Sequence, residues 1–283
     1  LARIHHLRGN LLFPMGRAED CAREHAQALH CARRSGSPEL ETRALGGLAD
    51  AEFARGRMIS AHQAFTECCE LAQRHGYVRI EAANRPMVAH TLFYMLDMVA
   101  SLREADRAVA LAKAIGHARA ALIAQLAAAW ALLYQGELDQ ALVRVDEAEA
   151  LVERIGAKRF EPEVLQLRAE MCMWAGDASA AWAYAERALA VSRETSVGFM
   201  GASILGCIAW SGPDASVRQA ALAKGEEVLA AGSAGHSVLN FRYYAIEAAI
   251  LAEDWDEAER QGATLEAYSR AEPLPWSIFY TAR

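Results

Sequence analysis

The sequence predicts an all-α protein built as a solenoid of about seven antiparallel helix pairs. Three observations support this fold class: alanine is very abundant, strand-forming residues show no sustained alternation, and glycines recur with a period of 40 residues. Alanine favours helix because it loses no side-chain entropy there. Self-similarity at a fixed period of this length is the signature of repeat architectures, in which neighbouring helix pairs stack.

Glycines recur at two positions of the repeat, and we call each set of equivalent positions a column. The first column closes helices, because glycine tolerates the left-handed conformation at a helix end and basic residues such as Arg33 and Arg34 precede it. The segment Ser37-Pro38-Glu39 then has the composition of a helix start. The second column marks the tight turn inside each pair. The first column is Gly36, Gly76, Gly116 and Gly156, continued by Ser196, and the second is Gly16, Gly56, Leu96, Gly136 and Gly176.

Small residues follow the turn glycines at fixed distances. The turns GELDQA (136–141) and GDASAA (176–181) both place alanine five residues after glycine, and a later copy, DWDEA (254–258), has Glu253 in the glycine position. This pattern resembles the tetratricopeptide repeat (TPR). The resemblance implies a TPR-like α-α superhelix, right-handed, with the first helix of each pair on the concave face. HEAT repeats share a period near 40 and are the alternative, although they do not require this turn.

The whole chain, 1–283, is expected to form a single solenoid domain. It begins with Leu1 and ends in what looks like a helix that has barely started, so we expect a fragment of a longer protein. Apolar surface at the C-terminal end predicts a homodimer through that end. The sixth repeat is shorter, with its turn at 211–214. The predicted repeats are approximately 1–36, 37–76, 77–116, 117–156, 157–196, 197–233 and 234–271, followed by the start of a further helix at 272–283.

Composition excludes several functional classes. The net charge is −7 and no basic stripe is visible, which argues against direct binding of nucleic acid. Six scattered cysteines indicate free, mostly buried thiols in a reducing compartment rather than a disulfide framework. The most apolar run, Ala120 to Tyr134, contains Gln125 and is too short to span a bilayer, and no signal peptide is present. These features predict a cytoplasmic protein without a membrane partner.

The sequence lacks the short motifs that would indicate an enzyme. It contains no GxxxxGK[ST], GxGxxG, HExxH, CxxC or GxSxG segment, so we expect neither a catalytic residue nor a cofactor. Acidic clusters in 226–227 and 256–259 are interpreted as solvated helix faces without buried partners. The vicinal Cys68 and Cys69 are expected to point to different helix faces and to pack in the core.

The strongest hint of a metal is Cys21 and His25, which share a helix face at i, i+4. Zinc needs about four converging ligands. We therefore expect no metal. Cys21 occupies a position that holds a small residue in each repeat, and His25 packs beside it. The other residues that could lie near this pair are His5, His6, His30 and Cys31.

The concave face is the candidate binding site, because its predicted residues mix aromatic, charged and amide side chains that suit recognition of a peptide or small molecule. The alternatives are a merely solvated face for the polar residues and ordinary packing between repeats for the aromatic ones. The candidates are Arg3, His6, Asn10, Arg43, Asp50, His90, Tyr94, Trp130, Glu163, Gln166, Glu170, Asn240, Tyr243 and Glu247, together with the aromatic positions Phe13, Phe53, Phe93 and Trp174.

Three segments resemble the C-terminal helical region of large bacterial proteins that carry a class III adenylyl or guanylyl cyclase domain followed by a signalling ATPase domain. They are LARIHHLRGNLLFPMG (1–16), EHAQALHCARRSGSPELETRALGGLADAEFARG (24–56) and AEPLPW (271–276). The resemblance implies a non-catalytic module that binds a protein or peptide segment, or a small-molecule effector, and controls an attached enzyme. The alternatives are the ligand-sensing solenoid of a transcription activator, whose repeats are similar, and a stand-alone enzyme.

Overall fold

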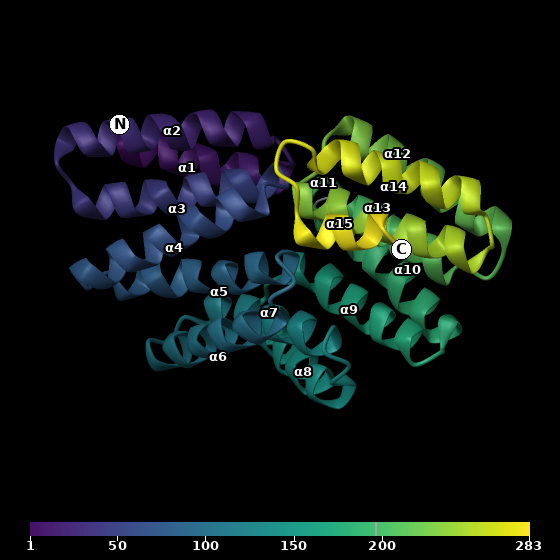
Figure 1. Ribbon diagram of the computed structural model, residues 1–283. Coiled ribbons are helices and arrows are strands. Elements are labelled where there is room, and N and C mark those ends of the chain that lie inside the picture. Colours follow the sequence, from purple (N-terminus) through teal and green to yellow (C-terminus); the bar gives the residue numbers. More distant parts are fainter. Residues whose placement is uncertain (196) are drawn as a thin grey trace. The chain divides into compact units, whose positions relative to one another are not determined.

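The computed structural model describes residues 1–195 and 197–283. These residues form fifteen α-helices and two short 3₁₀ helices, and they contain no strand. Consecutive helices pack in pairs joined by tight turns (Figure 1), which confirms the prediction of an all-α, TPR-like helical repeat solenoid. The chain divides into two compact units, Leu1–Gly156 (unit 1) and Ala157–Arg283 (unit 2), which are described separately. The organisation of 1–283 as a single domain stays a prediction.

Unit 1 consists of four helix pairs, and a 3₁₀ helix, η1 (Phe13–Met15), follows its first helix. The first helices of the pairs are α1 (Ala2–Leu12), α3 (Pro38–Ala54), α5 (Val78–Tyr94) and α7 (Ala118–Leu133). The second helices are α2 (Ala18–Ser35), α4 (Met58–His75), α6 (Met98–Ala114) and α8 (Leu138–Ile155).

Unit 2 begins with a 3₁₀ helix, η2 (Lys158–Phe160), and continues with three helix pairs and one short final helix. Its first helices are α9 (Glu161–Trp174), α11 (Val197–Ser211) and α13 (Gly235–Leu251). Its second helices are α10 (Ala178–Thr195), α12 (Ala215–Ala231) and α14 (Trp255–Ser269), after which comes α15 (Pro275–Thr281). The side chain of Asp214 caps α12 by accepting a hydrogen bond of 2.9 Å from the backbone N–H of Val217.

Both glycine columns adopt the left-handed conformation that the sequence predicted. Their φ angles run from 62° at Gly36 to 82° at Gly176. Two described residues other than glycine also have positive φ, Leu96 (60°) and Glu253 (56°), and both occupy the turn-glycine position of their repeat. The turn geometry is therefore imposed by the repeat, whichever residue stands there. Ser196, the expected fifth member of the helix-closing column, lies outside the described residues.

The small-residue columns form the packing surfaces between helices. Ala49, Ala89, Ala129 and Ala169 are fully buried, 40 residues apart, on successive first helices. The second helices carry the matching buried column Ala28, Cys68, Ala108, Ala148 and Ala188. Their small volume lets helix backbones approach closely, as the period of 40 indicated.

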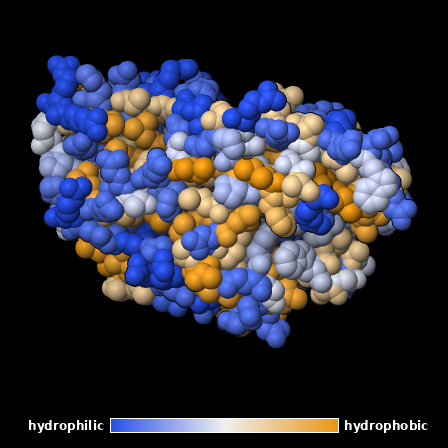
Figure 2. All heavy atoms as spheres, viewed as in Figure 1, coloured by the Kyte–Doolittle hydropathy of each residue, from blue (hydrophilic) through white to orange (hydrophobic). Residues whose placement is uncertain are grey.

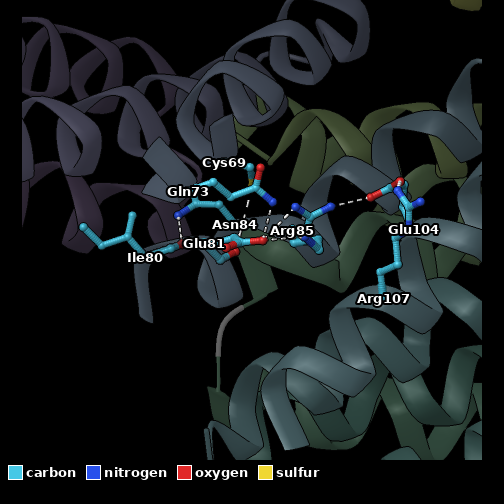
Figure 3. A network of polar contacts seen from close by, with 8 residues as sticks. All are labelled: Cys69, Gln73, Ile80, Glu81, Asn84, Arg85, Glu104 and Arg107. Atoms are coloured by element: carbon cyan, nitrogen blue, oxygen red, sulfur yellow. Dashed lines mark hydrogen bonds and ion pairs between the residues drawn. The ribbon is translucent and has the colours of Figure 1, made fainter. Parts of the chain in front are cut away.

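A network of polar contacts centred on the largely enclosed Arg85 joins three helices of unit 1 (Figure 3). Arg85 on α5 donates to Glu81 Oε1 on its own helix (2.7 Å) and to Glu104 Oε2 on α6 (2.7 Å). Gln73 on α4 donates to the same oxygen of Glu81 at 2.8 Å, and Arg107 donates to Glu104 at 2.8 Å. The side chains of Arg85, Glu81 and Glu104 are only 12–13% exposed. Removing one of these charges would therefore leave its partner poorly solvated and without a counter-ion.

Arg242 on α13 performs a similar role in unit 2. It donates to Glu226 Oε2 on α12 (2.9 Å) and to Gln261 Oε1 on α14 (2.8 Å). The interpretation of the acidic cluster 226–227 as a solvated face without a buried partner is therefore wrong for Glu226. The guanidinium beside it lowers the pKa of Glu226, mainly through the hydrogen bond. This contact could not be predicted locally, because Arg242 lies on the next helix, 16 positions away.

Candidate functional site

The first helices of unit 1 present a set of polar side chains, which we call the first-helix face of unit 1. Arg3 and Asn10 on α1 and Arg43 on α3 are exposed. Arg3 and Arg43 lie one period apart, at the same position of neighbouring repeats. Three further predicted candidates on these helices, His6, Asp50 and His90, are half-buried.

His6 connects α1 with the second helix of its pair, α2. Its Nε2 lies 3.2 Å from Asn10 Nδ2, and its ring meets that of His25 edge to face, with centroids 5.3 Å apart. Burial, and then the positive charge of Arg43, lower the pKa of His6. His6 is therefore neutral near pH 7, and Nε2 can accept a hydrogen bond. The full positive charges on this face belong to Arg3 and Arg43, of which Arg43 also contacts Glu39 Oε1 at 2.9 Å.

Aromatic rings from α3, α5 and α7 pack at the turn ends of these helices. Phe93 lies at the centre of the cluster, with its ring centroid 5.2 Å from Tyr94, 5.8 Å from Trp130 and 4.8 Å from Tyr134. The rings of Phe53, Phe93, Tyr94 and Trp130 are at most 7% exposed. These candidates are thus packed against one another, as in ordinary repeat packing. Tyr134 was not among the predicted residues, although it follows Trp130 by one helical turn.

Unit 2 brings two predicted candidates of α9 together with tyrosines of α13. Gln166 donates from Nε2 to Tyr244 Oη at 3.0 Å, and Ser203 Oγ on α11 donates to Gln166 Oε1 at 3.0 Å. Tyr244 and Tyr243 donate from their hydroxyls to Glu170, at 2.5 and 3.5 Å. Gln166 and Glu170 are fully buried. Burial, and then the negative charge of Glu170, raise the pKa of Tyr244 well above its usual value.

This network of buried side chains links three first helices, α9, α11 and α13, so it stabilises the packing of the helices. Of the five residues, Tyr244 and Ser203 were not predicted as candidates. Their partners lie 78 and 37 positions away in the chain, and nothing in the local sequence indicates such a contact.

The remaining candidates of unit 2 lie closer to the surface. Glu163, Asn240 and Glu247 are half-buried, and Trp174 is 41% exposed, so Trp174 is not part of the core. Glu247 accepts a hydrogen bond from Arg283 at 2.6 Å. Burial raises the pKa of Glu247 even though Arg283 opposes the shift.

His25 is enclosed between two glycines. A Cβ atom on Gly9 of α1 or Gly47 of α3 would lie 2.3 or 2.0 Å from its ring, so this imidazole fills the space of two missing side chains. Neither ring nitrogen has a hydrogen-bond partner among the described residues. Burial lowers the pKa of His25 to about 4. In the described part of the chain no group of three or more His, Cys, Asp or Glu side chains is placed to hold a metal ion.

The cysteines are free, and four of the six are buried, as predicted. Cys68 Sγ lies 3.3 Å from the carbonyl of Thr42 on α3, whereas Cys69 Sγ lies 3.9 Å from the carbonyl of Glu81 on α5. The two vicinal thiols thus point to different neighbours. Burial raises the pKa of Cys69 to about 12, so this thiol is not a reactive thiolate at neutral pH.

A pocket of about 550 Å³ lies between the ends of α6, α7 and α8 in unit 1. Its charged lining consists of Lys113, Glu147 and Arg154, with His117 beside them. Lys113 Nζ lies 3.4 Å from Glu147 Oε2, so two of these charges already compensate each other. Across the described helices, none is both long enough and apolar enough to cross a membrane.

The sequence matches no protein-family model and no curated protein. Solved structures are similar in fold. Aspartyl phosphate phosphatase F from Bacillus subtilis has a TM-score of 0.68 at 12% identity, over 98% of this chain and 71% of that one. NprR in complex with its cognate peptide NprX has a TM-score of 0.61 at 14% identity, over 99% and 86%.

A signal transduction ATPase with numerous domains from Pyrococcus horikoshii, which has a tetratricopeptide repeat sensor, is also similar. Its TM-score is 0.55 at 14% identity, and the match covers 98% of this chain and 42% of that one. At these identities the likeness establishes the fold of this chain.

Proposed function

We propose that this TPR-like helical repeat protein is a non-catalytic regulatory module whose first-helix face in unit 1 binds a peptide segment of a protein partner. The observation that carries the proposal is the pair Arg3 and Arg43 one period apart on neighbouring first helices, both exposed, with Asn10 beside them. Evenly spaced donors along stacked repeats suit an extended chain, because each repeat can bind one part of it.

The chemistry of these side chains favours a peptide that carries a carboxylate, from an acidic side chain or from its C-terminus. Arg3 and Arg43 are cations, and Asn10 offers an amide whose Nδ2 already lies 3.2 Å from His6 Nε2. Arg43 also pairs with Glu39 Oε1 at 2.9 Å, an exposed contact on its own helix that a ligand carboxylate would share or replace. The fold agrees with this role, since NprR, a similar structure, was solved with its cognate peptide.

A catalytic role finds less support in the geometry. Several buried titratable groups, among them Glu170 and Tyr244 in unit 2 and His25 in unit 1, lie inside the helix packing. An enzyme requires its acid, base or nucleophile to reach the substrate. Binding by exposed side chains is therefore the function that these residues support best.

Native mass spectrometry of the purified chain tests the proposal first, because a co-purified peptide appears as a definite added mass. Panning the chain against a displayed peptide library then supplies a labelled ligand. We expect enriched peptides to carry at least one acidic residue. Arg43→Gln should weaken binding about tenfold, the effect of losing roughly 1.4 kcal/mol of a charge-assisted contact.

Arg103→Gln is the matched control, because Arg103 is an exposed arginine on a second helix, α6. Its affinity for the selected peptide should equal that of the unchanged chain. Equal affinity of the Arg43→Gln and Arg103→Gln variants would show that the peptide does not bind at the first-helix face of unit 1. A selection that returns no acidic preference, together with unchanged binding when the C-terminus of the selected peptide is amidated, would reject the carboxylate in the proposed ligand.

We also propose that the chain is part of a larger signalling protein. The resemblance of 1–16, 24–56 and 271–276 to the C-terminal region of bacterial cyclase–ATPase proteins supports a cytoplasmic sensory arm of such a protein. The match to a repeat sensor of a signalling ATPase, of which the chain covers 42%, agrees with this context. Deleting the 1–283 region from the parent protein should change the activity of the attached enzyme; an unchanged activity and partner set would remove the regulatory role.

A homodimer through the C-terminal end stays a prediction. Ile278 and Phe279 on α15 are 56% and 50% exposed, which supplies an apolar contact. Light scattering at rising concentration should show a dimer, and Phe279→Ser should weaken it. A monomer at high concentration would contradict this prediction.

A further inference from the structure

The pocket between α6, α7 and α8 combines an apolar lining with two cations. Its volume of about 550 Å³ is in the range of small-molecule sites. Exposed apolar residues are scattered over the face of the molecule that Figure 2 shows, so apolar surface alone does not mark a site in this chain. The pocket differs because Lys113 and Arg154 lie beside its apolar residues. The apolar lining consists of Ala112, Ala118, Ala121, Ala150 and Leu151.

The earlier repeats have a polar contact at the equivalent junction of helices. Where α2 meets α3, Arg33 donates from Nε to Glu41 Oε1 at 2.9 Å. Where α4 meets α5, one period later, Gln73 donates from Nε2 to Glu81 Oε1 at 2.8 Å. Each contact joins the end of a second helix to the start of the next first helix. The repeat therefore places a donor opposite a carboxylate at this position.

The third junction, between α6 and α7, has the donor without the carboxylate. Lys113 follows Gln73 by 40 residues, but the residue 40 positions after Glu81 is Ala121. Both Lys113 and Ala121 line the pocket. A methyl group thus stands where the two earlier repeats have a carboxylate. A ligand that brings its own carboxylate would complete the contact with the lysine.

The charges around the pocket favour an anion. Lys113 Nζ lies 3.4 Å from Glu147 Oε2, but the two side chains are 62% and 45% exposed, so this ion pair contributes little. Glu147 also accepts a hydrogen bond from Nε2 of the fully buried Gln125, and it keeps this donor when Lys113 contacts a ligand. Arg154 has no ion pair among the described residues, so one positive charge at the pocket is uncompensated.

His117 supplies a further donor. Its Nδ1 accepts a hydrogen bond of 3.2 Å from the backbone N–H of Ala120 and caps α7. The ring proton is therefore on Nε2, which can donate. The lining of the pocket thus offers an ammonium group, a guanidinium group and an imidazole N–H to a carboxylate.

We propose that this pocket binds a small molecule that carries a carboxylate on an apolar body. The carboxylate takes the place of the glutamate that the earlier repeats have at the position of Ala121, beside Lys113 and Arg154. The apolar body lies against the alanines and Leu151. The pocket is separate from the first-helix face of unit 1, so the inference does not rest on the proposed function.

Octanoate and phenylbutyrate are the probes, one with a flexible alkyl body and one with an aromatic ring. Each is compared with its primary amide, which has nearly the same shape and no charge. NMR titration of the isotope-labelled intact chain gives the affinity and shows which residues respond. We expect saturable shifts in 112–121 and 147–154 with at least one acid, and at least about tenfold weaker binding of its amide. Inorganic phosphate should bind more weakly than the acid, because it has no apolar body.

Ala121→Glu gives the pocket its own carboxylate in the register of the earlier repeats, and it should abolish binding of the acid. Lys113→Gln and Arg154→Gln should each weaken binding about tenfold. Both side chains are exposed, so these two variants leave the helix packing intact, and an unchanged melting temperature checks this. Arg74→Gln is the matched control, because Arg74 is an exposed arginine on α4, two periods before Arg154. It should bind like the unchanged chain.

Two results with the unchanged chain would overturn the proposal: no response of the lining residues to either acid, or equal affinity for acid and amide. Full binding by a folded Ala121→Glu variant would also overturn it, because the carboxylate would then bind elsewhere. Phosphate that binds as tightly as the acids would assign the pocket to an inorganic anion and equally contradict the proposed ligand.

Discussion

Lowering the pH from 7 to 5 should destabilise unit 1, and the buried imidazole of His25 contributes a share of the loss that can be isolated by substitution; burial also lowers the pKa of His90 to about 4. His25 on α2 is fully buried between Gly9 and Gly47, and neither of its nitrogens has a hydrogen-bond partner among the described residues. The ring of His6 on α1 and the carboxylate of Glu24 on α2 are its charged or titratable neighbours. A proton on His25 would therefore be poorly solvated, which is why burial lowers its pKa to about 4.

The size of the effect follows from the two pKa values. In the unfolded chain the imidazole has its ordinary pKa of 6.5, and in the folded chain about 4. Because the unfolded state binds the proton first as the pH falls, folding stability is complete above pH 6.5 and decreases down to pH 4. The full loss is about 3 kcal/mol, and about 2 kcal/mol of it falls between pH 7 and pH 5.

Urea unfolding followed by circular dichroism at pH 7 and pH 5 measures this loss, and NMR titration of the ring protons gives the pKa of His25 directly. His25→Leu removes the titrating group at similar volume, so the loss between the two pH values should shrink by about 2 kcal/mol. His30→Leu, on the exposed side of the same helix, is the control. A measured pKa above 6, or the same pH dependence in the chain with and without His25, would refute the reasoning.

Three further predictions concern unit 2, each measured by urea unfolding. Glu253→Gly should stabilise the protein by about 0.5 kcal/mol, because relief of a left-handed φ (about 1 kcal/mol) exceeds the added entropy of the unfolded chain; no gain would show that the turn is unstrained. Gly225→Ala should cost about 2 kcal/mol, since its Cβ would lie 2.1 Å from the Phe241 ring, and a neutral effect would mean that the ring moves freely. Tyr244→Phe should cost about 2 kcal/mol by removing a donor from buried Glu170, whereas an unchanged stability would place water at that carboxylate.

The repeat and its turns could be predicted from the sequence because they depend on local conformation. A left-handed residue every 40 positions leaves a visible column of glycines, and a close helix contact leaves a column of alanines. Leu96 and Glu253 are exceptions, since their backbones adopt the positive φ of a turn glycine although neither residue is glycine. The period located the turn at Leu96, and the match to the turn motif located the one at Glu253, even though neither residue is glycine.

The candidate site could be predicted only in part, because a repeat position specifies a helix face but not what covers it. Arg3 and Arg43 lie exposed on first helices, as their positions suggested, while Glu170 and Trp130 at comparable positions are buried. Glu170 is buried by Tyr244, which lies 74 residues further along the chain. Such contacts depend on the particular side chains of two distant repeats, and a single sequence holds no signal for them.

Arg242 also limits which repeat can precede its own. The helix pairs share one backbone plan, so a duplicated or exchanged pair would meet a surface of nearly the right shape. Its charges would not match, because Arg242 on α13 needs Glu226 on α12, the second helix of the preceding pair, whereas the carboxylates that pair with Arg85 lie within its own pair. A misplaced neighbour would leave a cation buried without its counter-ion, at a cost of several kcal/mol. A polar contact between neighbouring pairs thereby helps to specify the order of the repeats. Such contacts disfavour the pairing of a repeat with the wrong copy during folding of a self-similar chain.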